Sequence, residues 1–191
     1  MISTLISILI IPIWTIVFLV GSVTYYLIMS LFGSKNIHIV SRLLARLFIL
    51  SGFQRFEVQG HLPDKKNGPY LYLFNHGSIF DPFMIIAAVP HYISGVGSKE
   101  QFEWPVWGRL AKKYGLIPIE RKNINSAVKS LDALENAINK GVSAAISPEG
   151  TRTLTGKMNE FKKGPFHVAF NTGVTIIPVA LKGCLLYTSD A

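Results

Sequence analysis

A histidine and an aspartate five positions apart are the residues of this sequence best suited to proton transfer. His76 and Asp81 lie in the segment Asn75–Asp81, directly after the apolar run of residues 70–74. A neutral histidine takes a proton from an alcohol when its other ring nitrogen is held in the right tautomer, and a nearby carboxylate holds it so. Such transfer contributes about 10²–10⁴-fold in rate. The pair therefore predicts general-base activation of a hydroxyl group.

Asp81 has a second, structural interpretation. It precedes Pro82, so it can be the N-cap of a helix that has proline at its first position. The two roles are compatible, because one carboxylate oxygen can cap the helix while the other holds His76.

A single arginine follows a second apolar run. Arg121 ends residues 116–120, where a guanidinium can grip a phosphate group with two parallel hydrogen bonds. The alternative for one arginine at a strand end is a solvated charge.

The segment Ser147–Arg152, with the sequence S-P-E-G-T-R, follows a third apolar run at residues 143–147. Its proline and glycine suit a β-turn. The turn alone does not explain why Glu149, Thr151 and Arg152 gather at the sheet edge expected for the histidine. Backbone amides near the glycine, together with the arginine, can hold a phosphate.

Strands and helices are expected to alternate beyond residue 53, which predicts an α/β fold in which a mixed sheet is layered with helices. Loops that follow the strands then carry the polar residues. The third predicted helix begins at Asn123 or Asn125 and stops at Gly141. The predicted strands are residues 55–59, 69–74, 92–97, 116–120, 143–147 and 174–181, and the predicted helices are residues 82–89, 102–114, 124–140 and 160–172.

The N-terminal part of the chain is apolar. No charged side chain occurs from Met1 to Ser34, and residues 5–32 are long enough to cross a bilayer core, which takes roughly 20 helical residues. Pro12 and Gly21 can kink this helix or break it into a re-entrant pair. All basic residues follow it, so the positive-inside rule puts the rest of the protein on the cytoplasmic side.

Residues 37–53 form a predicted amphipathic helix, with Arg42 and Arg46 on one side. It either lies in the membrane interface with its cations towards headgroup phosphates or packs on the core as an ordinary domain helix. The expected organisation is a membrane-anchoring part at residues 1–53, a catalytic domain at residues 54–183 and a tail at residues 184–191.

Composition limits the partners and the cofactors. The formal net charge is +8, from 19 Lys and Arg against 11 Asp and Glu, which suits an anionic partner such as lipid headgroups. The basic residues form no run interleaved with aromatic residues, so nucleic-acid binding is not expected. The one cysteine, Cys184, excludes an internal disulfide or a cysteine-based zinc site, and the histidines form no metal-ligand cluster.

Four motifs follow one another along the chain: Asn75–Asp81 with the pattern His-x4-Asp, Gly115–Arg121, Ser147–Arg152 and Ile177–Val179. In this order they resemble the motifs of the glycerolipid acyltransferases, the lysophosphatidate acyltransferase family. The resemblance runs from about residue 55 to Gly183. Ser147 stands where the family commonly has an apolar or aromatic residue, and Thr153 where serine is usual. Residues 184–191 show no likeness to the family, so we expect a truncated chain with a non-family tail.

The resemblance implies a membrane-bound enzyme of phospholipid biosynthesis. It transfers an acyl group from acyl-CoA or acyl carrier protein to the free hydroxyl of 1-acyl-sn-glycerol-3-phosphate, giving phosphatidic acid. A bacterial-type inner membrane is the expected location, and no cofactor or metal is expected. The implied catalytic residues are His76 and Asp81, and the implied substrate-binding residues are Asn75, Ser78, Arg121, Glu149, Gly150, Thr151 and Arg152.

Two alternatives remain open at the level of sequence. The acceptor can be another lysolipid, such as a lyso-aminolipid or a lysophospholipid with a larger headgroup. The chain can also be a non-catalytic module that binds anionic lipids through its basic surface, in which case His76 and Asp81 are dispensable.

Overall fold

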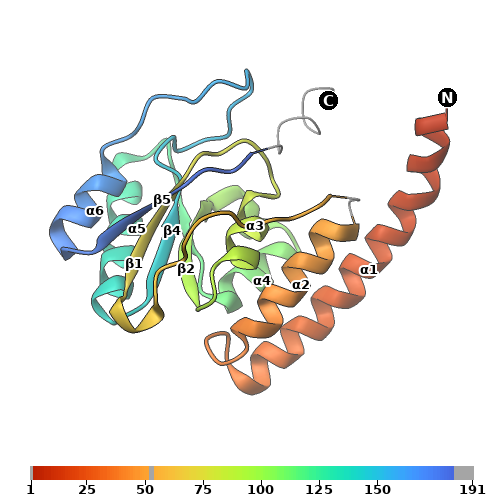
Figure 1. The fold of residues 1–191 in the computed structure, drawn as a ribbon, viewed down its shortest axis with the longest axis horizontal. Coiled ribbons are helices and arrows are strands. Elements are labelled where there is room, and N and C mark those ends of the chain that lie inside the picture. Colours follow the sequence, from red (N-terminus) through yellow and green to blue (C-terminus); the bar gives the residue numbers. More distant parts are fainter. Residues whose placement is uncertain (1, 52–53, 183–191) are drawn as a thin grey trace.

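A computed structural model describes residues 2–51 and 54–182. Its centre is a five-stranded sheet with the strand order β3-β2-β4-β1-β5, and every neighbouring pair is parallel (Figure 1). The α/β class and the layering with helices predicted from sequence are confirmed. The strands are β1 (Tyr70–Phe74), β2 (Ile93–Ser98), β3 (Ile117–Ile119), β4 (Ser143–Ile146) and β5 (Thr175–Val179).

The alternation of side chains along β1 supplies both faces of the sheet. Leu71 and Leu73 point to one face, where they form a buried cluster with residues of α5 (Ile124–Asn139) and α6 (Gly164–Thr172). Tyr70, Tyr72 and Phe74 point to the other face and pack on α3 (Asp81–Ala88). All five residues of β1 are buried, as expected for the interior of a parallel sheet.

The N-terminal helices add an outer layer on the α3 side. Helix α1 (Ile2–Phe32) and helix α2 (His38–Ser51) lie beside each other next to α3 and α4 (Trp107–Tyr114), as Figure 1 shows in red and orange. Residues Thr15–Phe32 of α1, with a mean hydropathy of 1.9, form the one span among the described residues that is long and apolar enough to cross a membrane. Of the two effects considered for Pro12 and Gly21, a kink or a break into a re-entrant pair, the break does not occur, because α1 is a single helix.

Helix α2 combines the two interpretations given to residues 37–53. Ala45 and Ile49 are buried against Ala87 of α3, so one side packs on the domain. The opposite side exposes Ile39, Leu43, Leu47 and Leu50. Arg46, whose side chain is exposed, also contacts the domain, because its Nε donates a hydrogen bond to the carbonyl oxygen of Ala87 at 3.3 Å. A helix end offers unpaired carbonyl groups, and Arg46 satisfies one of them.

Several other boundaries differ from the predicted ones. The strand expected at residues 55–59 is not formed, because Phe56 packs against the α2–α3 cluster and the sheet edge beside β1 is taken by β5. The helix expected at residues 102–114 is divided around Pro105 into a 3₁₀ turn at Lys99–Glu103 and α4. A further 3₁₀ turn spans Lys65–Asn67. Residues 52–53 and the tail at 184–191 lie outside the described residues.

The remaining helix boundaries have local causes. The side chain of Asn123 caps α5 by accepting a hydrogen bond from the Ser126 amide at 3.1 Å, which confirms the predicted start. Gly141 follows the helix with a φ of +78°, a conformation that favours glycine. Helix α6 begins at Gly164, four residues later than predicted, with Pro165 in its first turn.

Candidate active site

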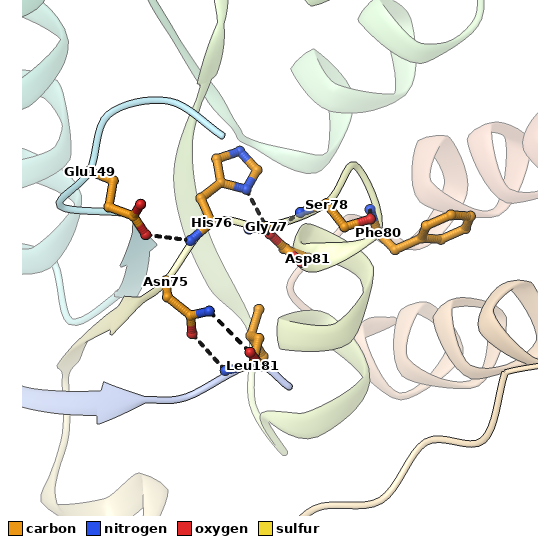
Figure 2. Close-up of polar contacts among 8 residues, drawn as sticks. All are labelled: Asn75, His76, Gly77, Ser78, Phe80, Asp81, Glu149 and Leu181. Atoms are coloured by element: carbon orange, nitrogen blue, oxygen red, sulfur yellow. Dashed lines mark hydrogen bonds and ion pairs between the residues drawn. The ribbon is translucent and has the colours of Figure 1, made fainter. Parts of the chain in front are cut away.

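The loop between β1 and α3 holds His76 against Asp81. His76 Nδ1 lies 2.7 Å from Asp81 Oδ2, and the same oxygen accepts the backbone amides of Gly77 at 2.8 Å and Ser78 at 2.9 Å (Figure 2). A carboxylate oxygen accepts hydrogen bonds, so in this contact Nδ1 is the donor and carries the ring proton. The other ring nitrogen, Nε2, points away from Asp81 in Figure 2 and is left without a proton when the imidazole is neutral. The loop therefore presents a base.

Asp81 is not the N-cap of α3, contrary to the sequence prediction. It is the first helical residue, and its Oδ2 accepts amides of the preceding loop rather than of the helix turn. The prediction that one oxygen caps while the other holds His76 is also wrong, because Oδ2 makes all three contacts. Oδ1 is buried without a hydrogen-bond partner among the described residues.

Glu149 connects the loop after β4 to the loop after β1 through hydrogen bonds. Its carboxylate is almost fully buried, with Oε1 accepting the backbone amide of His76 and Oε2 that of Asn159, both at 2.8 Å. The Thr153 amide also donates to the carbonyl oxygen of His76 at 2.9 Å. The backbone of His76 is thus held from the neighbouring strand end, which sequence reasoning did not foresee.

Asn75 ties the same loop to the end of β5. Its Oδ1 accepts the Leu181 amide at 2.7 Å, and its Nδ2 donates to the Leu181 carbonyl oxygen at 3.0 Å (Figure 2). The side-chain amide therefore pairs with a residue beyond β5 much as a peptide group does. Both polar atoms of Asn75 are used in this way.

A pocket of about 240 Å³ opens beside His76. It is walled by the loops that follow β1, β4 and β5, which meet at one edge because the strands are parallel. Its lining residues are Asn75, His76, Gly77, Asp81, Glu149, Thr153, Gly156, Met158, Leu181 and Lys182.

The structure brings together only part of the predicted site. Asn75, His76, Asp81 and Glu149 line the pocket. Ser78 does not, since it is fully buried and its Oγ accepts the Phe80 amide at 3.2 Å. The remaining predicted ligands lie outside the lining of this pocket; they are Arg121, Gly150, Thr151 and Arg152.

Arg121 is the most distant of these residues in the sheet. It follows β3, which is separated from β1 by β4 and β2. Three strand spacings of about 4.8 Å correspond to about 14 Å between the two strand ends.

The predicted turn at Ser147–Gly150 is formed, with the Gly150 amide donating to the Ser147 carbonyl oxygen at 3.2 Å.

Six pocket residues were missed by sequence reasoning: Gly77, Thr153, Gly156, Met158, Leu181 and Lys182. Position 153 was noted only as a departure from the family pattern. Leu181 and Lys182 follow the fourth motif directly, and that proximity was the available signal. Nothing in the sequence around Gly156 and Met158 indicates a pocket.

A separate apolar cavity of about 210 Å³ lies between the N-terminal helices and the domain. Side chains of α1, α2, α3 and α4 line it, among them Phe48 and Phe83. The Phe48 ring lies 5.5 Å from that of Phe80, which belongs to the loop that carries His76. The cavity and the His76 loop are therefore neighbours.

A buried polar cluster lies beneath the sheet at the other end of β1. His91 Nε2 is 3.3 Å from the hydroxyl of Tyr72 and 3.1 Å from that of Ser143. Burial lowers the pKa of His91, and it also lowers the pKa of His38, whose Nε2 lies 3.0 Å from the carbonyl oxygen of Val89. Among the described residues, no group of three or more His, Cys, Asp and Glu is placed to hold a metal ion.

Comparison with known proteins gives concordant results. Residues 55–182 match the model of a family described as Acyltransferase. The chain is 31% identical over 172 residues to the chloroplastic 1-acyl-sn-glycerol-3-phosphate acyltransferase BAT2 of Brassica napus, covering 88% of this chain and 48% of that protein. It is 32% identical over 159 residues to the 1-acyl-sn-glycerol-3-phosphate acyltransferase of Haemophilus influenzae, covering 82% and 65%. The chain thus spans about half to two thirds of the length of these relatives.

A solved structure shares the fold. The crystal structure of the 1-acyl-sn-glycerophosphate acyltransferase PlsC from Thermotoga maritima superposes with a TM-score of 0.83, at 20% sequence identity, over 98% of this chain and 79% of that one. The similarity extends over the N-terminal helices as well as the sheet.

Proposed function

Since this chain belongs to the acyltransferase family, we propose that it transfers an acyl group to the free hydroxyl of 1-acyl-sn-glycerol-3-phosphate and so forms phosphatidic acid. The donor is an acyl thioester of coenzyme A or of acyl carrier protein. The names of the relatives support the acceptor, and the His76–Asp81 pair supports the chemistry.

The observation that carries the proposal is the 2.7 Å contact between His76 Nδ1 and Asp81 Oδ2, in a ring that lines the pocket. His76 Nε2 takes the proton of the acceptor hydroxyl. Asp81 stabilises the imidazolium that results, as a carboxylate beside a catalytic histidine does. The two backbone amides on Oδ2 fix the carboxylate, so the ring keeps its tautomer between turnovers.

The deprotonated oxygen then attacks the thioester carbonyl carbon. The new C–O bond forms, the C–S bond breaks, and the departing sulfur takes the proton from His76 Nε2. The enzyme returns to its starting state without a covalent acyl intermediate, a metal ion or a cofactor. Among the described residues, the pocket lining contains no serine or cysteine that could act as a nucleophile towards the thioester.

The apolar cavity supports a place for an acyl chain. Its lining combines rings and aliphatic side chains from four helices, with Phe48 next to the His76 loop. Burial of a methylene group is worth about 0.8 kcal/mol, so such a cavity can hold a chain while its carbonyl stays near the base.

The surface of α1 and α2 supports a membrane location, with the domain on the cytoplasmic side of a bacterial-type inner membrane. Exposed apolar side chains run along both helices, from Ile16 to Phe32 on α1 and from Ile39 to Leu50 on α2. The basic residues that follow the charge-free segment favour the cytoplasmic side.

The proposal is tested by product analysis. The purified chain in detergent or vesicles is incubated with lysophosphatidate and either acyl-CoA or an acyl thioester of acyl carrier protein. Mass spectrometry then identifies the product. We expect phosphatidic acid from the wild type and about 10²–10⁴-fold slower turnover from His76→Ala. His61→Ala, at an exposed histidine, is the matched control and should keep wild-type turnover. Near-normal turnover by His76→Ala would contradict the proposed mechanism.

Offering other lysolipids to the same preparation tests the acceptor. Equal turnover with a lysophospholipid of larger headgroup contradicts the assignment of lysophosphatidate while leaving the chemistry intact. No turnover with any acceptor, together with intact lipid binding, favours the non-catalytic alternative.

A further inference from the structure

The cationic residue that lines the pocket is not one of those that the sequence motifs suggested. Arg121 and Arg152, the predicted phosphate ligands, do not line the pocket beside His76. Of the described residues that do line it, Lys182 is the one with a permanently cationic side chain. It lies three residues beyond β5, outside all four motifs.

The pocket is lined by acidic residues, so a nearby cation is needed for a phosphate group to bind there. Two carboxylates, Asp81 and Glu149, line the same space. A substrate phosphate that enters next to them meets like charges, which disfavour its binding unless an opposite charge is close. Phosphate groups occur on the proposed acceptor and on the coenzyme A or phosphopantetheine part of the proposed donor, so either substrate brings this chemistry.

The position of Lys182 is fixed by its neighbour in the chain. Leu181 is held through both its amide and its carbonyl group by the Asn75 side chain, and Asn75 directly precedes His76. The β1–β5 register continues to Phe74 and Val179, so these hydrogen bonds extend the pairing beyond the strand ends. The backbone at the base of Lys182 is therefore tied to the backbone at the base of His76.

We propose that Lys182 binds a phosphate group of a substrate at the His76 pocket, and that Asn75 is the positioning residue that holds it there. This rests on the proposed function, because it names a group that meets the substrates of the same site. In this proposal Asn75 connects the loop after β1 to the segment after β5, whereas the sequence resemblance implied that Asn75 contacts the substrate.

The test is a comparison of Lys182→Ala with Lys182→Arg in steady-state kinetics. A hydrogen bond to a charged group corresponds to roughly 10- to 100-fold in binding, so Lys182→Ala should raise one KM by that factor with kcat little changed. Lys182→Arg keeps the charge and should restore most of the loss. Lys157→Ala is the matched control, since Lys157 is an exposed cation between the pocket residues Gly156 and Met158 but does not line the pocket.

Separate arms distinguish the two sources of phosphate. A higher KM for lysophosphatidate alone assigns Lys182 to the acceptor. A higher KM for acyl-CoA, which disappears with an acyl thioester of N-acetylcysteamine that has no phosphate, assigns it to the donor. Unchanged KM values for both substrates, or an equal effect of Lys157→Ala, overturn the proposal.

A binding measurement keeps the outcome separate from that of the proposed function. If the wild type turns over no substrate, the proposed function fails, and equilibrium binding of lysophosphatidate in non-ionic micelles and of free coenzyme A still tests Lys182. Weaker binding of either ligand to Lys182→Ala than to wild type supports the proposal. Equal binding of both ligands overturns it. Asn75→Ala should weaken the same ligand as Lys182→Ala, and Asn75→Asp, which removes the donor to the Leu181 carbonyl, should do so partly.

Discussion

The loop edge around His76 and the pair of helices α1 and α2 use burial in opposite ways. At the loop edge, polar side chains such as Asp81 and Glu149 are buried and their oxygens accept backbone amides. On the helix pair, apolar side chains such as Leu31 and Leu43 face outward. Buried polar groups are tolerated when they are hydrogen-bonded, and exposed apolar patches mark surfaces that meet lipid or another partner.

The loop edge therefore serves the catalytic chemistry, and the helix pair serves attachment to the membrane. The first region fixes the orientation of one base to within the tolerance of a hydrogen bond. The second supplies contact area, to which no single residue is indispensable. A substitution in one region should therefore leave the property of the other unchanged, and four substitutions or conditions test how far the separation holds.

The largest effect is expected at Asp81. Asp81→Asn keeps the shape of the side chain but replaces the carboxylate with a neutral amide. The amide no longer holds the proton on His76 Nδ1 as a carboxylate does, so the ring can adopt the wrong tautomer. Activity should fall about 10²–10⁴-fold, comparable to the loss in His76→Ala, because the pair acts as a unit. Turnover measures the loss, and vesicle flotation should show unchanged membrane association. Loss of both properties together would break the separation.

The next largest effect is expected at Glu149, in stability as well as in activity. Glu149→Gln removes one of two acceptors for buried amides and the negative charge, which costs about 1.5–3 kcal/mol. For a chain of this size, Tm falls about 2–4 °C for each kcal/mol. Thermal unfolding measures it, with Glu160→Gln, an exposed glutamate of the same loop, as the control.

The result also decides between two roles for Glu149. A lower Tm with a parallel fall in turnover matches the connection to His76. An unchanged Tm with a higher KM for lysophosphatidate would instead support the substrate contact that the family resemblance implied.

A smaller effect is expected on the helix pair. Leu43→Lys places a charge on the outward side of α2 and removes apolar contact worth about 1.5–3 kcal/mol if the side chain is buried in lipid. Vesicle flotation should show weaker association, with kcat for micellar substrate unchanged. Val128→Lys on α5 is the matched control, since Val128 is 50% exposed and Leu43 is 57% exposed. Equal effects of the two variants would contradict a lipid-facing role for α2.

The smallest effect concerns acid. Burial lowers the pKa of His38 and His91 from the ordinary value of 6.5, so the unfolded chain binds more protons than the folded one just below that value. Stability is fully present above pH 6.5 and is lost as the pH falls below it, by at most about 1.4 kcal/mol per pH unit for each histidine. Thermal unfolding at pH 7 and pH 5 measures it. An equally steep loss in His91→Gln would show that His91 does not contribute.

Local signals in the sequence were sufficient for much of the fold and for the centre of the site. The alternation in β1, the Asn123 cap and the Gly141 stop each act within a few residues, so their elements were predictable. His76 and Asp81 are five residues apart in one loop, and their contact was predictable for the same reason. The strand expected at residues 55–59 is not formed because Phe56 packs against α2 and α3 instead, and a local pattern does not report whether a segment reaches a strand with which it can pair.

The sequence by itself determined which residue types were available for chemistry: one histidine beside one aspartate, and a charge-free segment for the membrane. Only the tertiary structure decided which distant residues meet them. Parallel strands place the ends of β1, β4 and β5 together and the end of β3 about 14 Å from β1. Lys182 and Glu149 therefore join His76 at the pocket while Arg121 does not, because strand order is set by packing of the whole sheet and not by any one motif.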